Sequence, residues 1–240
     1  MKITTAMLLA AGLGTRMKPL TDTLPKPLIE VGGRTLVDRV LDKLVAQGVT
    51  RAVVNVHYLA DQMEAHLRPR KDIEIIISDE RDLLLETGGG VIKALPLLGD
   101  DPFFVINTDV TWATPGDTTF AKMAEAYDPN EMDALLLVAE MGATLGFRGP
   151  GDFFLGHDGH LQRRGDKPRA PYVFAGTHIT HAGVLRDYEI KPFSANVYWN
   201  AMGRAGRLYG TVMSPFWMHV GDPAGRDEAE ARLKMMGPES

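Results

Sequence analysis

The first half of the chain alternates between short apolar runs and longer stretches with helical spacing, and this alternation restricts the fold more than any other feature. Four apolar runs predict strands that are buried on both faces: residues 6–10, 52–56, 73–77 and 103–106. Three stretches between them predict helices: residues 34–47, 59–67 and 91–98. Because strands that alternate with helices at this spacing form parallel sheets, we expect an α/β fold with a doubly wound, mainly parallel sheet.

The second half is less regular. Three patterns predict helices: residues 118–127, 194–204 and 222–236. Three others predict strands: residues 134–139, 172–179 and 211–220. No repeat, low-complexity segment or linker divides the sequence, so residues 1–240 are expected to form a single domain.

Small residues and two cations follow the first predicted strand. Residues 7–17 read MLLAAGLGTRM, and residues 24–28 read LPKPL. Small residues let backbone N–H groups approach a polyanion closely, and Arg16 and Lys26 supply positive charge where phosphates would lie. Pro25 and Pro27 restrict the backbone on either side of Lys26, so its side chain is presented from a stiff segment. This segment therefore predicts a triphosphate-binding loop.

Other phosphate-binding patterns fit this segment less well. A dinucleotide fingerprint needs a third glycine after Gly12 and Gly14, and Met17 stands at that position, although Glu30 could serve as the acid that binds the ribose. A Walker A loop needs a Gly-Lys-Ser/Thr sequence after the glycines, and that sequence is missing. A tight turn without a ligand would explain the glycines, but neither the arginine nor the Pro-Lys-Pro.

Composition excludes several other functions. The formal net charge is −5, so a broad basic surface for nucleic acid is not expected. The chain contains no cysteine, which excludes disulfides, thiolate metal sites and cysteine nucleophiles. No apolar stretch approaches membrane-spanning length, and the amino-terminal residues lack a signal-peptide pattern. We therefore expect a soluble, cytoplasmic protein without a membrane partner.

Two further polar motifs follow predicted strands. Asn107 and Asp109 come directly after the run 103–106, and a carboxylate there can hold Mg²⁺, which prefers oxygen ligands and bridges to substrate phosphates. The alternative for Asp109 is a turn or helix cap, because Asn and Asp often lie where strands end. Residues 86–90 read ETGGG, whose glycines let the chain pass flat against a nucleobase and leave open N–H groups at a helix start. A flexible glycine hinge would give the same pattern.

Together these motifs resemble the signature of the sugar-1-phosphate nucleotidyltransferases, and most closely that of the short N-acetylmuramate-1-phosphate uridylyltransferases. The resemblance implies a Rossmann-like fold of the glycosyltransferase-A type, with a nucleotide-binding half at residues 1–115 and a sugar-binding half at residues 116–240. It implies transfer of a nucleotidyl group from a nucleoside triphosphate, expected to be UTP, to a sugar 1-phosphate, expected to be N-acetylmuramate 1-phosphate. It further implies Mg²⁺ or Mn²⁺ as cofactor, a role in peptidoglycan recycling and the cell wall, and a monomer or weak homodimer.

The resemblance also assigns roles to single residues. Arg16, Lys26 and Asp109 are the expected catalytic residues, with Asp109 as a metal ligand. Asn107 and Asp152 are expected to contact the sugar, although the turn-forming sequence around Asp152 would explain that residue without a ligand. The expected nucleotide contacts are Leu9, Ala10, Ala11, Gly12, Gly14, Thr15, Arg16, Lys26, Glu86, Thr87 and Gly88.

The carboxyl-terminal part departs from the family pattern. Members of the family carry a Trp-x-Asp-x-Gly segment whose aspartate is a second metal ligand, whereas residues 217–221 read WMHVG. His219 therefore takes the place of the aspartate, and imidazole suits Mn²⁺ or Zn²⁺ better than Mg²⁺. Asp222 could either reach the metal or cap the predicted terminal helix. A site completed by Asp109, phosphates and water is the simplest interpretation.

Two other functions are left open by the sequence. The same reaction with other substrates, such as mannose 1-phosphate with GTP or phosphocholine with CTP, fits the first half of the chain as well. A regulatory subunit that binds nucleotide sugars without catalysis would explain His219. Such a subunit has little need of Arg16, Lys26 and Asp109 together.

Overall fold

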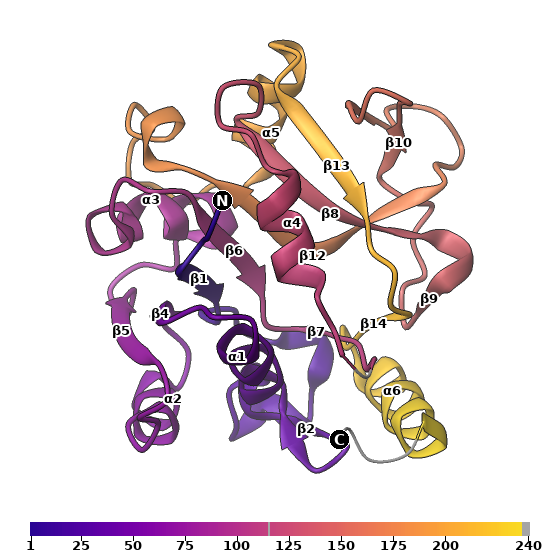
Figure 1. Cartoon of the computed structure of the whole chain (residues 1–240). Coiled ribbons are helices and arrows are strands. Elements are labelled where there is room, and N and C mark those ends of the chain that lie inside the picture. Colours follow the sequence, from indigo (N-terminus) through magenta and orange to yellow (C-terminus); the bar gives the residue numbers. More distant parts are fainter. Residues whose placement is uncertain (115, 237–240) are drawn as a thin grey trace.

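The computed structural model describes residues 1–114 and 116–236, and a parallel sheet lies at its centre (Figure 1). Its four strands lie side by side in the order β5 (Glu74–Asp79), β4 (Arg51–Val56), β1 (Thr5–Leu9) and β6 (Phe103–Asn107). In this register Leu8 lies beside Val54, and Leu9 lies beside Asn107. The carboxyl ends of the strands therefore meet at one edge of the sheet, where ligands of open α/β sheets bind.

Antiparallel strands extend the sheet beyond β6. β12 (Tyr172–Thr180) pairs antiparallel with both β6 and β8 (Ala134–Glu140), and β13 (Leu208–Val212) pairs in parallel with β8. Two short strands continue from the start of β12: β10 (Phe153–Leu155) and β11 (Leu161–Arg163). The expected α/β fold with a mainly parallel central sheet is confirmed, and the second half adds antiparallel strands to it.

Helices cover both faces of the sheet, as a doubly wound fold requires. The first face is covered by α1 (Leu36–Ala46), α2 (Ala60–Leu67) and α4 (Thr119–Ala126). The second face is covered by α3 (Glu86–Leu98) and α5 (Asn196–Arg204). Successive side chains of β1 enter opposite cores, because Leu8 packs in the first and Met7 in the second, and both are fully buried.

A small sheet carries the carboxyl-terminal segment to the edge where the parallel strands end. β14 (Trp217–His219) pairs antiparallel with β7 (Val110–Thr111) and in parallel with β9 (Thr144–Leu145). In this register His219 lies directly beside Val110, so the segment comes next to Asp109. α6 (Pro223–Met236) packs behind it. The remaining short elements are β2 (Glu30–Val31), β3 (Arg34–Thr35) and 3-10 turns at Thr15–Met17, Leu20–Asp22, Lys26–Leu28, Met141–Ala143 and Ala182–Val184.

Two predicted elements differ from the structure, and the others are confirmed with small shifts at their ends. α3 starts at Glu86, so the three glycines lie inside its first turns and not before it. The predicted strand at 211–220 is divided into β13 and β14. Pro215 lies between these two strands and has no N–H group to donate to a sheet.

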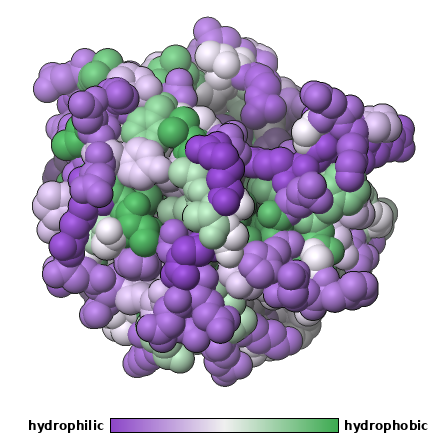
Figure 2. All heavy atoms as spheres, turned by 90° about the horizontal axis from the view of Figure 1, so that it is seen from above, coloured by the Kyte–Doolittle hydropathy of each residue, from purple (hydrophilic) through white to green (hydrophobic). Residues whose placement is uncertain are grey.

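The surface seen from above is largely hydrophilic, and the apolar residues on this face lie in small groups between polar side chains (Figure 2). Within residues 1–114 and 116–236, the structure contains no helix that is long and apolar enough to cross a membrane.

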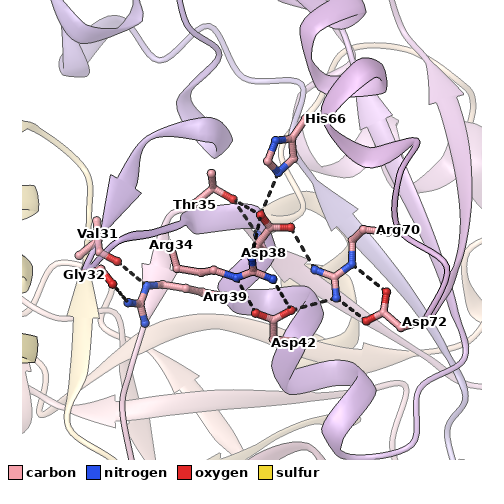
Figure 3. A network of polar contacts seen from close by, with 10 residues as sticks. All are labelled: Val31, Gly32, Arg34, Thr35, Asp38, Arg39, Asp42, His66, Arg70 and Asp72. Carbon is pink, nitrogen blue, oxygen red and sulfur yellow. Dashed lines mark hydrogen bonds and ion pairs between the residues drawn. The ribbon is translucent and has the colours of Figure 1, made fainter. Parts of the chain in front are cut away.

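A charge network ties α1 to the chain that follows α2 (Figure 3). Asp38 on α1 has a side chain that is 8% exposed, and its carboxylate lies 3.0 Å from Arg70 and 2.9 Å from His66. Arg70 also pairs with Asp42 at 2.9 Å and with Asp72 at 2.6 Å. Burial alone would raise the pKa of Asp38, but its hydrogen bonds, including the one to His66, hold that pKa below its ordinary value. The network therefore depends on an ionised carboxylate at Asp38.

We expect Asp38→Asn to lower the free energy of unfolding by about 3 kcal/mol at pH 7, because it breaks a buried ion pair with Arg70. Asp42→Asn is the matched control, since that side chain is 43% exposed and its pair should contribute about 1 kcal/mol or less. The lowered pKa of Asp38 stabilises the fold above the unfolded value of about 3.9, and this stabilisation is lost as pH falls through the folded value. Urea unfolding at pH 7 and pH 3 measures both effects. An unchanged difference between wild type and Asp38→Asn at the two pH values would contradict this account.

Candidate active site

A cavity of about 460 Å³ opens at the edge of the sheet where β1 and β6 end. Its wall combines the loop after β1, the start of α3 and the turn after β6, segments that are far apart in the sequence. The predicted site residues that line it are Leu9, Ala10, Ala11, Gly12, Gly14, Thr15, Arg16, Lys26, Glu86, Thr87, Asn107 and Asp109. This clustering follows from parallel strands, whose carboxyl ends lie together.

A buried amide and a buried carboxylate support the loop after β1, and sequence analysis missed both. Oδ1 of Asn55 on β4 accepts the N–H groups of Ala10 at 2.7 Å and Ala11 at 3.2 Å. Nδ2 of Asn55 donates to Glu80 at 2.7 Å, and Glu80 accepts the N–H group of Leu85 at 3.0 Å. Through Asn55 on β4, these hydrogen bonds join the loop after β1 to the loop between β5 and α3, and they occupy the amides of Ala10 and Ala11. The signal in the sequence was an asparagine inside an apolar run.

The second part of the same loop lies against the segment that carries Lys26. Gly14 has a positive φ of 63°, and a Cβ there would lie 2.9 Å from Thr21 and 3.1 Å from Lys26. Glycine is therefore required for this close approach. A Cβ at Gly12 would meet nothing within 4 Å, so this part of the loop faces open space. Arg16 is exposed at the rim of the cavity.

Lys26 and Asp109 form an ion pair in the wall of this cavity. Nζ of Lys26 lies 2.7 Å from Oδ2 of Asp109, and the two side chains are 13% and 23% exposed. Pro25 and Pro27 flank Lys26, which begins a 3-10 turn. Burial alone would raise the pKa of Asp109, but the charge of Lys26 and the hydrogen bond with His219 hold that pKa well below its usual range. Asp109 is therefore ionised at neutral pH, directly beside a cation.

His219 lies beside the same carboxylate, whereas the hydrogen bond of Asp222 is to the start of the terminal helix. Nε2 of His219 is 3.5 Å from Oδ2 of Asp109, and its ring stacks on Trp217. Asp222 accepts the N–H group of Gly225 at 2.8 Å and so caps α6, which is one of the two roles considered for it.

The donor atoms of Asp109 and His219 fit a divalent cation, because a carboxylate oxygen and an imidazole nitrogen converge there. In the part of the chain that the structure describes, no group of three or more His, Cys, Asp or Glu side chains could hold a metal. Phosphate oxygens and water would therefore have to complete the coordination of such an ion.

The start of α3 packs against the segment before α5. The N–H groups of Gly88 and Gly89 donate to the carbonyl of Phe193 at 2.8 Å and 3.2 Å. A Cβ at Gly89 would collide with the carbonyl of Lys191, so the close approach of two backbones requires glycine here. The expectation that Gly88 offers an open N–H group to a nucleobase is therefore wrong, whereas the neighbouring Thr87 lines the cavity.

A second cavity of about 250 Å³ adjoins the first. Four residues line both cavities: Leu9, Thr87, Asn107 and Ser194. Asp152, which the sequence associates with a sugar, lies in the wall of the second cavity together with Asn107. Oδ2 of Asp152 accepts the N–H group of Phe174 at 3.0 Å, which fixes the orientation of its carboxylate.

Other residues in this second wall were not identified from the sequence. They are Phe153, Arg163, Phe174, His178, Ala195, Asn196 and Trp199. Burial lowers the pKa of His178 to about 3, so its imidazole is neutral at pH 7. The wall of the second cavity therefore combines polar and aromatic side chains.

Comparison with known proteins finds similar chains along nearly the whole sequence. The MobA-like NTP transferase domain matches residues 6–182. The N-acetylmuramate alpha-1-phosphate uridylyltransferase of Caulobacter vibrioides is 47% identical over 232 residues, which cover 95% of this chain and 96% of that protein. The mannose-1-phosphate guanyltransferase of Aspergillus fumigatus is 32% identical over 229 residues, which cover 91% of this chain and 61% of that protein.

Solved structures share the fold. The crystal structure of HddC from Yersinia pseudotuberculosis, complexed with GMP-PN, superposes with a TM-score of 0.79. The match covers 96% of this chain and 99% of HddC at 23% sequence identity, so it concerns the fold alone.

Proposed function

Since the chain belongs to the sugar-1-phosphate nucleotidyltransferases, within the MobA-like NTP transferase family, we propose that it transfers a uridylyl group from UTP to N-acetylmuramate 1-phosphate. The products are UDP-N-acetylmuramate and pyrophosphate. The observation that carries this proposal is the 47% identity, over nearly the full length of both chains, to a uridylyltransferase of that sugar. The guanyltransferase relative supports the alternative pair, GTP and mannose 1-phosphate, less strongly, because this chain spans only 61% of its length.

The reaction is an in-line displacement at phosphorus. A phosphate oxygen of the sugar 1-phosphate attacks the α-phosphorus of the nucleotide, the bond to the bridging oxygen breaks, and pyrophosphate leaves with that oxygen. The attacking phosphate is ionised at neutral pH, so no general base is needed. Catalysis then depends on alignment and on neutralising the charge of the phosphates.

The residues around the first cavity are suited to these tasks. We assign Lys26 to the α-phosphate and the incoming phosphate, because its side chain lines the cavity and Asp109 holds its ammonium group there. Arg16, at the exposed rim, is assigned to the β- and γ-phosphates. Glu86 and Thr87 are assigned to the nucleobase.

We assign the sugar to the second cavity, with Asn107 and Asp152 binding its hydroxyl groups. The nucleotide would then contact mainly residues 1–115, and the sugar mainly residues 116–240. Asn107 and Thr87 belong to both cavities, and this shared wall supports binding of the attacking phosphate next to the nucleotide.

We propose Mg²⁺ as the cofactor, with Mn²⁺ as the alternative that an imidazole ligand would favour. Asp109 would hold the ion, and His219 lies beside this carboxylate as a second ligand candidate. When bound, such an ion neutralises charge on the phosphates. Mg²⁺ suits a site with few protein ligands, because it keeps several waters and binds phosphate oxygens. We also propose that the reaction takes place in the cytoplasm and serves the recycling of peptidoglycan sugars for the cell wall, since its product is an activated cell-wall sugar.

The proposal predicts a clear order of substrates. Pyrophosphate release is measured with each of four nucleoside triphosphates against N-acetylmuramate 1-phosphate, N-acetylglucosamine 1-phosphate, mannose 1-phosphate and phosphocholine. UTP with N-acetylmuramate 1-phosphate should give the highest kcat/KM. A preference for GTP with mannose 1-phosphate would overturn the proposal. No release with any pair would favour a regulator without catalysis.

Lys26→Ala should lower turnover about a thousandfold, because an aligned cation on the α-phosphate contributes several kcal/mol to the stability of the transition state. Lys18→Ala is the matched control, since Lys18 is an exposed lysine nearby that pairs with Asp22. Lys26→Gln serves as a second variant, because it keeps a hydrogen-bond donor for Asp109. Circular dichroism checks that each variant folds. Turnover above about a tenth of wild type in Lys26→Ala would remove Lys26 from the mechanism.

Asp109→Asn should abolish nearly all metal-dependent activity, whereas His219→Ala should raise the metal concentration needed for half-maximal activity by about 10- to 100-fold. His219→Asp should improve activity with Mg²⁺ relative to Mn²⁺, because carboxylate suits Mg²⁺ better than imidazole does. Titrations with both metals measure these effects, and Asp222→Asn is the control, expected to change stability and not metal dependence. Metal titrations identical to wild type in both His219 variants would show that His219 does not face the metal.

A further inference from the structure

Arg163 lies at the end of β11, half-buried in the wall of the second cavity, and has no role in the reaction as described above. We propose that Arg163 binds a carboxylate of the sugar substrate and so selects a sugar acid over its neutral counterpart. This inference rests on the proposed function. It names the group by which the site would distinguish N-acetylmuramate 1-phosphate from N-acetylglucosamine 1-phosphate, since the former carries a lactyl ether that ends in a carboxylate.

Neutral partners hold the guanidinium group of Arg163 in place. Its Nε donates to Oδ1 of Asn200 at 2.9 Å, and its Nη2 donates to Oδ1 of Asn196 at 2.5 Å. Its Cζ lies 4.6 Å from the centre of the Phe153 ring and 5.6 Å from that of Trp199. These contacts fix the plane of the side chain without neutralising its charge. Of the five N–H groups of an arginine, these two bonds use two, so three are left for a ligand.

The charge of Arg163 lacks an anionic partner in contact. No ion pair joins Arg163 to a carboxylate in the described part of the chain, and burial lowers the pKa of its guanidinium while Asp152 acts in the opposite direction. Arg70 shows the usual arrangement in this protein, since its buried guanidinium pairs with three aspartates. A partly buried cation without such partners favours an anionic ligand. A carboxylate fits, because arginine binds it in a planar, bidentate manner.

The position of Arg163 agrees with the orientation that the reaction requires of the sugar phosphate. The 1-phosphate must lie next to the nucleotide, at the wall that Thr87 and Asn107 share between the two cavities. Arg163 belongs to the second cavity and not to the shared wall. The guanidinium therefore faces a part of the sugar other than the reacting phosphate. Asp152, in the same wall, has one oxygen bonded to the Phe174 amide and is suited to hydroxyl groups.

The selectivity between two sugars tests this inference. We compare kcat/KM for N-acetylmuramate 1-phosphate and N-acetylglucosamine 1-phosphate, with saturating UTP, in wild type, Arg163→Gln and Arg163→Lys. Arg163→Gln should lower the value for the sugar acid about 100-fold, mainly through KM, and change the value for the neutral sugar less than about threefold. Arg163→Lys should restore part of the loss, because it keeps the charge and loses the bidentate geometry. Arg169→Gln, at an exposed arginine outside both cavities, is the control for net charge.

Equal losses for both sugars would overturn the inference, because they would indicate contact with the phosphate or a structural role. No loss for the sugar acid would overturn it as well. If wild type does not use either sugar phosphate, the proposed function fails. The inference about Arg163 is then tested by measuring the binding of the free sugars. Calorimetry then compares free N-acetylmuramate with N-acetylglucosamine in wild type and Arg163→Gln. Tighter binding of the acid that is lost in the variant supports the inference, and equal binding in both proteins overturns it.

Discussion

The parallel pairing of β1 between β4 and β6 is the constraint on which the rest of the structure depends. Both edges of β1 are paired, and its side chains enter the cores on both faces of the sheet. The pairing of Leu9 with Asn107 brings the loop after β1 beside the turn that carries Asp109. A slip of one residue would exchange the two faces of the strand and bury the wrong side chains, so the register is firmly specified. The register of the sheet therefore fixes the relative positions of the site residues.

Two polar layers lie at the edge of this sheet and serve different purposes. The deeper layer, Asn55 with Glu80, is hydrogen-bonded to protein groups and supports the loop after β1. The upper layer, Lys26 with Asp109, joins residues that are 83 positions apart and leaves donor and acceptor capacity for a ligand. A buried polar group without a partner lowers the stability of the fold. Because Asn55 and Glu80 are hydrogen-bonded, they can support the loop beside Lys26 and Asp109 without that cost.

The two kinds of strand pairing correspond to the two cavities. The parallel strands end at the larger cavity, and the antiparallel extension of β10, β11 and β12 forms much of the smaller one. The residues that line both cavities include Leu9 and Asn107 at the ends of parallel strands and Ser194 in the segment before α5. The phosphate site and the sugar site that we propose therefore lie on different parts of one sheet and share a wall.

The sequence by itself determined what local patterns encode: the alternation of strands and helices, the small-residue loop with Arg16 and Lys26, and the acid at Asp109. Each of these depends on short-range periodicity, backbone freedom or charge. Only the tertiary structure showed that the glycines after Glu86 serve backbone packing, that Asn55 supports the loop, and that Arg163 lies in the second cavity. These three findings depend on contacts between segments distant in the chain. Local propensity contains no information on such contacts, because they arise only when strand register and helix packing bring the segments together.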